Sequence, residues 1–338
     1  MSDDFDDISF IERYKILTNL NSQGNNALMI AAQYKHESNA VEQIFKGMED
    51  FPEHELAVIL MKTTSTGQNA LMLAAQYRPL DVPSILEGLS RISAQQAEVL
   101  AKTDTQGNNA LMLAARYQPA SIANILKSME NLSPTLRADI LAKTDSQGNN
   151  ALMFAARYQP ASVATILKSM ENLSPAQRAE ILAKTNSQGN NALMIAAEYQ
   201  PNGVIPILQS MENLSLAQRA EILTKTDTGG RNALKLALYH QQSVIIPILN
   251  SMESLSVAQK AEILIKTDRS GWNVLTLAVC DRTTAVAPIL EALSNNSMKD
   301  TYELLKSAVY DLVEMRGKRA SDTFRLFWEK DLHFFWKN

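Results

Sequence analysis

Apolar and polar residues follow a pattern that repeats about every 41 residues along the chain. A glycine opens each unit, at positions 24, 67, 107, 148, 189, 230 and 271. A nearly constant apolar phrase follows it, such as GNNALMFAA from Gly148, and decays to GRNALKLAL and GWNVLTLAV in the last two units. Seven such units cover residues 21–295, and a period of this length predicts an array of stacked repeats.

Turn signals divide each unit into three predicted helices. In the fourth unit, Asp145 and Gly148 fit the first and fourth positions of a type I turn. Asn150 then fits the N-cap of a short first helix, and Pro160 fits the first turn of a second helix. The apolar stripe of that second helix consists of Val163, Ile166, Leu167, Met170 and Leu173.

A capping box, in which a serine is followed three residues later by glutamine, predicts the start of the third helix. It is found at Ser174, and the same spacing recurs at Ser93, Ser215 and Ser256. A unit of three helices leaves apolar surface on both sides that only neighbouring units can cover. With only 12 glycines and 11 prolines, a turn-dense β-protein is disfavoured, and we expect an all-α solenoid.

The two ends depart from the repeat. Residues 1–20 are expected to form an N-terminal capping helix, because residues 9–21 align with the third helix of a unit. Residues 296–338 are expected to form a C-terminal helical cap. Its last part is rich in aromatic residues, namely Phe324, Phe327, Trp328, Phe334, Phe335 and Trp336. These rings either pack over the end of the seventh repeat or form a docking or delivery segment.

The phrase G-x-N-A-L-M-x-A-A resembles the G-x-T-P-L-H-x-A-A segment of ankyrin repeats. Asn replaces the capping Thr, Ala replaces Pro, Met replaces His, and the period exceeds the ankyrin period by about eight residues, which accounts for the third helix. Armadillo and HEAT arrays have a closer period but lack this glycine turn and cap. The resemblance implies a seven-repeat ankyrin-like solenoid that binds a protein partner. In style the repeats are also similar to effectors that intracellular bacterial pathogens deliver into host cells.

Composition excludes some classes of function and indicates the cellular compartment. The chain has 36 acidic and 32 basic residues, a net charge of -4, so it lacks the basic excess of a nonspecific nucleic-acid binder. Its single cysteine, Cys280, indicates a reducing compartment, and no export signal or transmembrane stretch is visible. We therefore expect a cytoplasmic protein, or one secreted by a bacterium into the host cytoplasm.

Partner contacts are expected on the concave face of the first helices and at the turn tips, where the repeat varies. One column reads Gln33, Gln76, Arg116, Arg157, Glu198, Tyr239 and Cys280, and the next reads Tyr34, Tyr77, Tyr117, Tyr158, Tyr199, His240 and Asp281. The tyrosines belong either to an interface or to the frame of the repeat. Trp272 replaces a tip asparagine, as an interface anchor or as part of a seal against the C-terminal helices. The predicted contacts are Arg116, Tyr117, Arg157, Tyr158, Tyr239 and Trp272.

Catalytic signals are poor. No metal-binding, P-loop, hydrolase or dinucleotide-binding motif is present, and no cofactor is expected. The methionine column (Met29, Met72, Met112, Met153 and Met194) is expected to be core. The function predicted is a non-enzymatic scaffold for protein interactions. The alternatives are a bacterial effector that presents a host protein to other machinery, and an enzyme of unknown type that uses His240 and Cys280.

Overall fold

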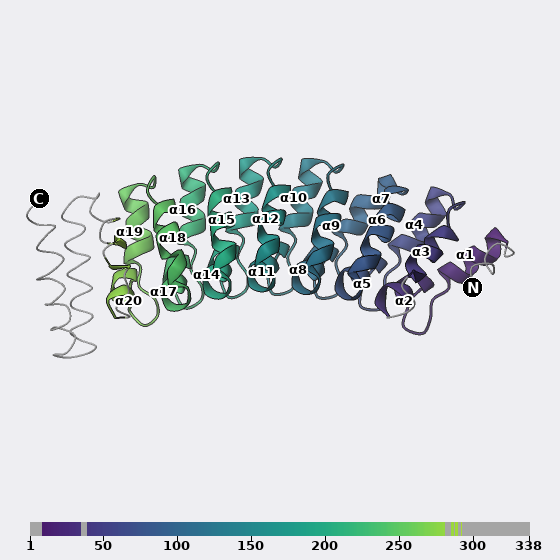
Figure 1. The fold of residues 1–338 in the computed structure, drawn as a ribbon, viewed down its shortest axis with the longest axis horizontal. Coiled ribbons are helices and arrows are strands. Elements are labelled where there is room, and N and C mark those ends of the chain that lie inside the picture. The colour runs from purple at the N-terminus through teal and green to yellow at the C-terminus, as the bar shows by residue number, and fades with distance from the viewer. Residues whose placement is uncertain (1–8, 35–38, 281–284, 287, 290–291, 293–338) are drawn as a thin grey trace, which may run out of the picture. The chain divides into compact units, whose positions relative to one another are not determined.

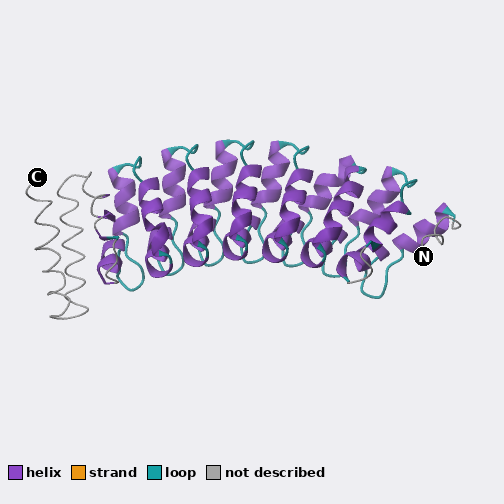
Figure 2. Cartoon of the chain, viewed as in Figure 1, coloured by secondary structure: helices purple, strands orange, loops and turns teal. Residues whose placement is uncertain are grey.

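A computed structural model describes residues 9–34, 39–280, 285–286, 288–289 and 292 of the chain. Every regular element among these residues is helical, which confirms the predicted all-α class (Figures 1 and 2). The chain divides into two compact units, unit 1 (Met1–Ile181) and unit 2 (Leu182–Asn338), with the boundary inside a third helix. The predicted C-terminal cap, 296–338, lies outside the described residues.

Within the first six repeats the helices follow the predicted order, and the first helix of the seventh is also described. The first helices are α2 (Ala27–Gln33), α5 (Ala70–Tyr77), α8 (Ala110–Tyr117), α11 (Ala151–Tyr158), α14 (Ala192–Tyr199), α17 (Ala233–His240) and α20 (Val274–Cys280). The second helices are α3 (Ala40–Lys46), α6 (Val82–Ser90), α9 (Ile122–Ser128), α12 (Pro160–Ser169), α15 (Val204–Ser210) and α18 (Ile245–Ser251). The third helices are α4 (Glu53–Met61), α7 (Ser93–Ala101), α10 (Pro134–Ala142), α13 (Pro175–Ala183), α16 (Leu216–Thr224) and α19 (Val257–Ile265). Short 3-10 turns precede four of the second helices: η1 (Pro79–Asp81), η2 (Pro119–Ser121), η3 (Pro201–Gly203) and η4 (Gln242–Val244).

A buried asparagine begins each first helix. Asn109 has none of its surface exposed, and its Oδ1 accepts the backbone N–H of Met112 at 2.9 Å, as the N-cap prediction requires. Its Nδ2 also donates to the carbonyl of Ile140 at 3.0 Å, near the end of the third helix of the same repeat. The same pair of bonds is made by Asn26, Asn69, Asn150, Asn191 and Asn232. One side chain therefore caps the first helix and fixes the third helix against it.

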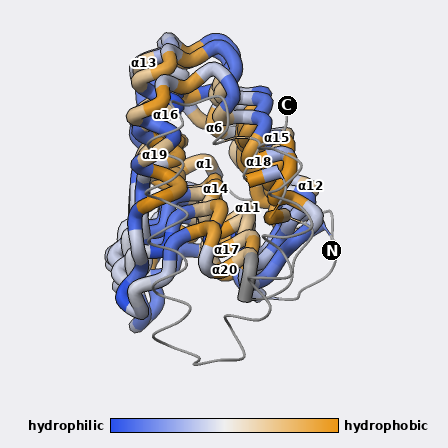
Figure 3. The backbone as a smooth tube through the Cα atoms, turned by 90° about the vertical axis from the view of Figure 1, so that its left-hand side faces the viewer, coloured by the Kyte–Doolittle hydropathy of each residue, from blue (hydrophilic) through white to orange (hydrophobic). Residues whose placement is uncertain are grey.

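Apolar side chains fill the space between the helices. In α8, Leu111, Met112, Ala114 and Ala115 are all buried, and the first helices are hydrophobic along much of their length in Figure 3. Each fully buried leucine stabilises the fold by about 1.5–3 kcal/mol. The methionine column is buried throughout, which confirms its prediction as core: Met29, Met72, Met112, Met153 and Met194.

The turns connect neighbouring repeats through the backbone. The N–H of Gly107 donates to the carbonyl of Asp104 at 2.9 Å, which closes the predicted four-residue turn. The N–H of Thr105 donates to Thr66 in the preceding repeat at 2.9 Å, and unit 2 has the equivalent bond from Thr228 to Gln188 at 2.8 Å. Gly107 has φ +83°, and a Cβ there would lie 3.0 Å from the Cα of Asp145 in the following turn. Glycine therefore satisfies both the left-handed backbone and the close approach of the next repeat.

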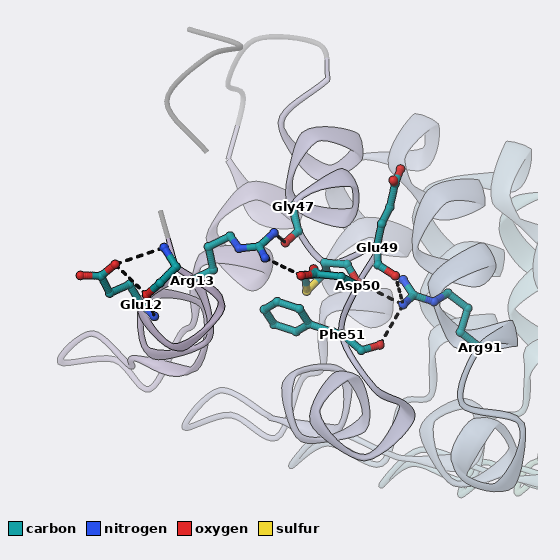
Figure 4. Close-up of polar contacts among 9 residues, drawn as sticks. Glu12, Arg13, Gly47, Glu49, Asp50, Phe51 and Arg91 are labelled. Atoms are coloured by element: carbon teal, nitrogen blue, oxygen red, sulfur yellow. Dashed lines mark hydrogen bonds and ion pairs between the residues drawn. The ribbon is translucent and has the colours of Figure 1, made fainter. Parts of the chain in front are cut away.

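Helix α1 (Phe10–Thr18) packs on the first repeat through an arginine (Figure 4). The Nη1 of Arg13 donates to the carbonyl of Gly47 at 3.1 Å, and its Nη2 pairs with Asp50 at 2.5 Å. The Nη2 of Arg91 reaches the same loop and donates to the carbonyl of Phe51 at 3.1 Å and to those of residues 48 and 49. Two guanidinium groups therefore hold this loop, and one of them ties α1 to it.

One predicted capping box is wrong. Ser215 and Ser256 form complete boxes, but α7 begins at Ser93 itself and its N-cap residue, Ile92, makes no side-chain bond. The second repeat is one residue shorter than most, so Gln96 takes the position that Arg137 has in α10, three residues before a buried Val or Ile. Its Nε2 donates to the carbonyl of Ser128 in the next repeat at 3.2 Å instead of completing the box.

Because Asn109 makes two side-chain hydrogen bonds, substitutions that remove one or both should lower the free energy of unfolding by different amounts. Asn109→Thr keeps a capping oxygen but leaves the Ile140 carbonyl without its donor, and we expect a loss of about 1–3 kcal/mol in the free energy of unfolding. Asn109→Ala removes both bonds and should lose about 1 kcal/mol more. Urea unfolding measures both, with exposed Asn124→Ala of α9 as the control, expected within about 0.5 kcal/mol of the parent. A threonine variant as stable as the parent would contradict the bridging role.

Alanine substitutions at Gly271 and Gly107 distinguish the cost of a left-handed backbone from the cost of a steric clash with the next turn. Gly271 has φ +78°, and no described atom lies within 4 Å of a Cβ built on it. Gly271→Ala should therefore lose only the cost of a left-handed alanine, about 1–2 kcal/mol. Gly107→Ala must also displace the following turn, so its urea midpoint should fall further. Equal losses at the two positions would show that the close approach of the turns carries no energy.

Candidate partner-binding surface

Half-exposed tyrosines lie at the C-terminal ends of the first helices, with Tyr34 directly after α2. In unit 1 these are Tyr34, Tyr77, Tyr117 and Tyr158, with 41–47% of their surface exposed. Residues 110–115 of α8 and 151–156 of α11 are buried, so the exposed surface of these helices is confined to their last two residues. We call Gln76, Tyr77, Arg116, Tyr117, Arg157 and Tyr158 the first-helix face.

The structure brings four of the predicted contacts together around a residue that the prediction omits. The guanidinium carbon of Arg116 lies 5.2 Å from the ring centroid of Tyr117 and 5.5 Å from that of Phe154 in the next repeat. Phe154 in turn stacks on Tyr158, with ring centroids 6.3 Å apart and planes 21° apart. Arg157 lies over Tyr158 at 5.5 Å. The result is a continuous strip of two cations and three rings across α8 and α11, which lie side by side in Figure 1.

Phe154 is the sequence signal that could have revealed the strip. Its column otherwise contains only aliphatic residues: Ile30, Leu73, Leu113, Ile195, Leu236 and Leu277. The single aromatic residue follows directly on the repeat that carries Arg116. A guanidinium that lies against aromatic rings loses less conformational freedom when it binds a ligand. Its N–H groups can still donate hydrogen bonds in the guanidinium plane. This arrangement favours recognition of a planar acceptor such as a carboxylate.

The other two predicted contacts lie in unit 2 and meet at one carboxylate. The hydroxyl of Tyr239 donates to Oδ2 of Asp268 at 3.4 Å, and the backbone N–H of Trp272 donates to Oδ1 at 3.0 Å. Asp268 is buried, whereas Trp272 is only partly exposed at the tip before α20. Tyr239 and Trp272 are therefore positioned through the same acidic turn residue.

A buried lysine interrupts the methionine column in unit 2. Lys235 is fully buried, and its Nζ donates to the carbonyls of Lys266 at 2.6 Å and Gly230 at 3.2 Å. Burial lowers the pKa of Lys235 to about 8, and the carboxylates of Asp268 and Asp227 offset part of that effect. The amine thus joins the end of α19 to the turn before α17, and burial of its charge reduces the stability that this link provides.

Only one member of the pair proposed for catalysis has a described side chain. His240 is exposed at the end of α17, with its ring centroid 6.2 Å from that of Tyr239. Cys280 ends α20, and its side chain lies outside the described part of the structure. Among the described residues, no three His, Cys, Asp or Glu side chains are placed to hold a metal ion. In the same part of the chain, no helix is long and apolar enough to cross a membrane.

The lowered pKa of Lys235 predicts a pH-dependent gain from Lys235→Met, the residue found in this column elsewhere. The folded pKa, about 8, lies below the ordinary 10.5, so the unfolded state binds more protons between these values and stability rises with pH across that window. At pH 7 the variant should be more stable than the parent by about 3 kcal/mol, and the difference should shrink to under about 1 kcal/mol at pH 10. Urea unfolding at both pH values tests this, and a difference that does not change with pH would contradict it.

Comparison with known proteins finds a family model that matches part of the repeat array. The family model described as ankyrin repeats (3 copies) matches residues 28–138. No curated protein matches the chain. Among solved structures, a match is found in the complex of a predatory endopeptidase from Bdellovibrio bacteriovorus with an immunity protein. It has 19% sequence identity and a TM-score of 0.43, and covers 67% of this chain and 98% of that chain.

The match begins in α2 and ends in α10, so it contains the first helices α5 and α8 with their buried asparagine caps. Its residues include the phrase that carries the resemblance, GQNALMLAA from Gly67 and GNNALMLAA from Gly107. The resemblance to the ankyrin family is confirmed there, and residues 28–138 carry ankyrin repeats.

Proposed function

We propose that this protein is a non-enzymatic scaffold that binds a partner protein through the first-helix face and the tips of its turns. Ankyrin repeats in residues 28–138 support a role in protein interactions. The observation that carries the proposal is the group of exposed Arg116, Tyr117 and Tyr158 held together by the buried ring of Phe154, because exposed aromatic rings and arginines supply much of the energy at protein interfaces.

The frame beneath the strip suits this role. The buried asparagine, the closed turn and the apolar first helix fix the backbone on which Arg116 and Tyr117 stand. A surface ordered in advance loses little conformational entropy when a partner binds. In unit 2, Tyr239 and Trp272 form a second group of proposed contacts, positioned by Asp268.

A charge reversal with a matched control tests the proposed surface. Arg116→Glu with Arg157→Glu changes two exposed residues of the first-helix face, and Lys127→Glu with Lys168→Glu makes the same charge change on the second helices α9 and α12. Each protein serves as bait in a eukaryotic lysate, chosen because the repeats resemble those of effectors delivered into host cells. We expect the amount of prey captured to fall at least tenfold with the arginine variant and to stay unchanged with the lysine variant.

Circular dichroism confirms that each bait is folded before the preys are compared. Trp272→Ala, tested separately, should weaken capture if the unit 2 contacts belong to the interface. A prey that is retained by the arginine variant and lost with the lysine variant would place the interface on the second helices and refute the proposed surface.

A further inference from the structure

We propose that unit 2 carries a second docking surface, a groove between the second helices α15 and α18 that takes an amphipathic helix of a partner protein, apolar on one face and with a basic residue at its end. The two helices lie side by side (Figures 1 and 3), and the groove between them has a volume of about 370 Å³. Buried Leu208 and Met211 line it together with Ile205 and Pro247. The inference goes beyond the proposed function, because none of these residues belongs to the first-helix face.

Exposed isoleucines distinguish this groove from its equivalent in unit 1. Ile205 of α15 and Ile246 of α18 have 48% and 43% of their surface exposed. The corresponding positions of α9 and α12 are the exposed Ala123 and Ala164. A proline follows each isoleucine, whereas a polar residue follows each alanine. Unit 2 therefore presents more apolar surface on this face, and a partner that covers the isoleucines removes that surface from water.

The lysines of the second helices are also replaced in unit 2. The groove between α9 and α12 is lined by Lys127 and Lys168, and their equivalents in α15 and α18 are the uncharged Gln209 and Asn250. Among the described residues that line the groove of unit 2, Arg219 alone is basic. A lysine at either position would lose part of its hydration under an apolar partner. The uncharged side chains remove that cost, so the groove of unit 2 is better suited to an apolar ligand.

Two glutamates make one end of the groove acidic. Glu212 and Glu253 follow α15 and α18, are exposed, and form no ion pair with a described Lys or Arg. The guanidinium of Arg219 instead donates to the carbonyl of Leu214 at 3.2 Å, to the carbonyl of Glu212, and to the hydroxyl of Ser254 at 3.4 Å. In unit 1 a lysine lies three residues before each equivalent glutamate, and unit 2 lacks it. The two carboxylates are therefore complementary to a Lys or Arg of the partner.

The spacing of these groups sets the pattern of the ligand. Ile205 and Glu212 are seven residues apart, as are Ile246 and Glu253, which corresponds to about 10 Å along a helix axis. A ligand helix that lies along the groove covers this distance in two turns and presents the same face at both ends. Helices that bind in apolar grooves use anchors at i, i+3, i+4 and i+7. We therefore expect apolar residues three or four positions apart beside the isoleucines, and a Lys or Arg two turns away beside the glutamates.

A displayed library tests the groove without assuming a partner. Peptides of 18 residues, with strong helix formers on one face and random residues on the other, are selected on the full chain and measured by fluorescence anisotropy. We expect the apolar and basic pattern described above to be enriched. Ile205→Lys with Ile246→Lys should weaken binding at least tenfold. Ala123→Lys with Ala164→Lys, the same change at the equivalent exposed positions of unit 1, should alter it less than twofold. Circular dichroism confirms that each variant is folded.

A charge reversal tests the basic residue of the ligand separately. Glu212→Lys with Glu253→Lys should weaken binding of the selected peptides at least fivefold. The same variant should bind peptides in which Glu replaces the basic residue more tightly than the parent does. Glu130→Lys with Glu171→Lys makes the equivalent change in unit 1 and should alter the affinity less than twofold.

Each other outcome overturns the inference. A library that yields no binder, or binders that neither change in unit 2 affects, would refute the groove as a docking surface. Binders that need the isoleucines but tolerate reversal of the glutamates would refute the basic partner. A dimer of the parent in sedimentation velocity that Ile205→Lys with Ile246→Lys abolishes would assign the groove to a second copy of the chain. Peptide binding that appears only after Phe327→Ala with Trp328→Ala would assign it to the C-terminal residues of the chain itself. All these variants leave the first-helix face unchanged, so the proposed function is tested independently by the capture experiment.

Discussion

The described structure depends on one buried side-chain amide in each of the first six repeats. In Asn109 the carbonyl oxygen caps the first helix while the amide nitrogen satisfies a carbonyl near the end of the third helix. A threonine at this position could form only the first of these bonds. The replacement of threonine by asparagine is therefore the change that accommodates a third helix, because the added helix presents a buried carbonyl that needs a donor.

The bonds made by the buried asparagines also determine where the exposed residues lie. Each repeat is fixed internally by its asparagine, and the backbone bond from Thr105 to Thr66 fixes neighbouring turns in register. Within each unit, residues at one position of the phrase therefore form columns with constant spacing. Variation in those columns, as from Gln76 to Arg116, changes the chemistry of the face without changing its geometry.

Sequence reasoning succeeded where the repeat itself supplied the information. Seven copies of the phrase reveal the turn, the cap at Asn150 and the apolar stripe, because a position that is constant across copies serves the same local purpose in each. It failed where a contact joins residues distant in sequence. The amide bond of Asn109 to Ile140, the position of Gln96 beside Ser128, and the place of Phe154 under Arg116 all depend on packing that no local pattern encodes.

The self-contained repeat also bears on how such an array can change in length. The asparagine bond begins and ends within one repeat, and within each unit the turn-to-turn bond joins equivalent backbone atoms of neighbouring repeats. Removal of residues 107–147 as a block would bring Gln106 to Gly148 and restore the same phrase at the junction. A duplication or loss in the gene, if it follows this period, adds or removes one member of each column while leaving the asparagine bonds of the other repeats in place.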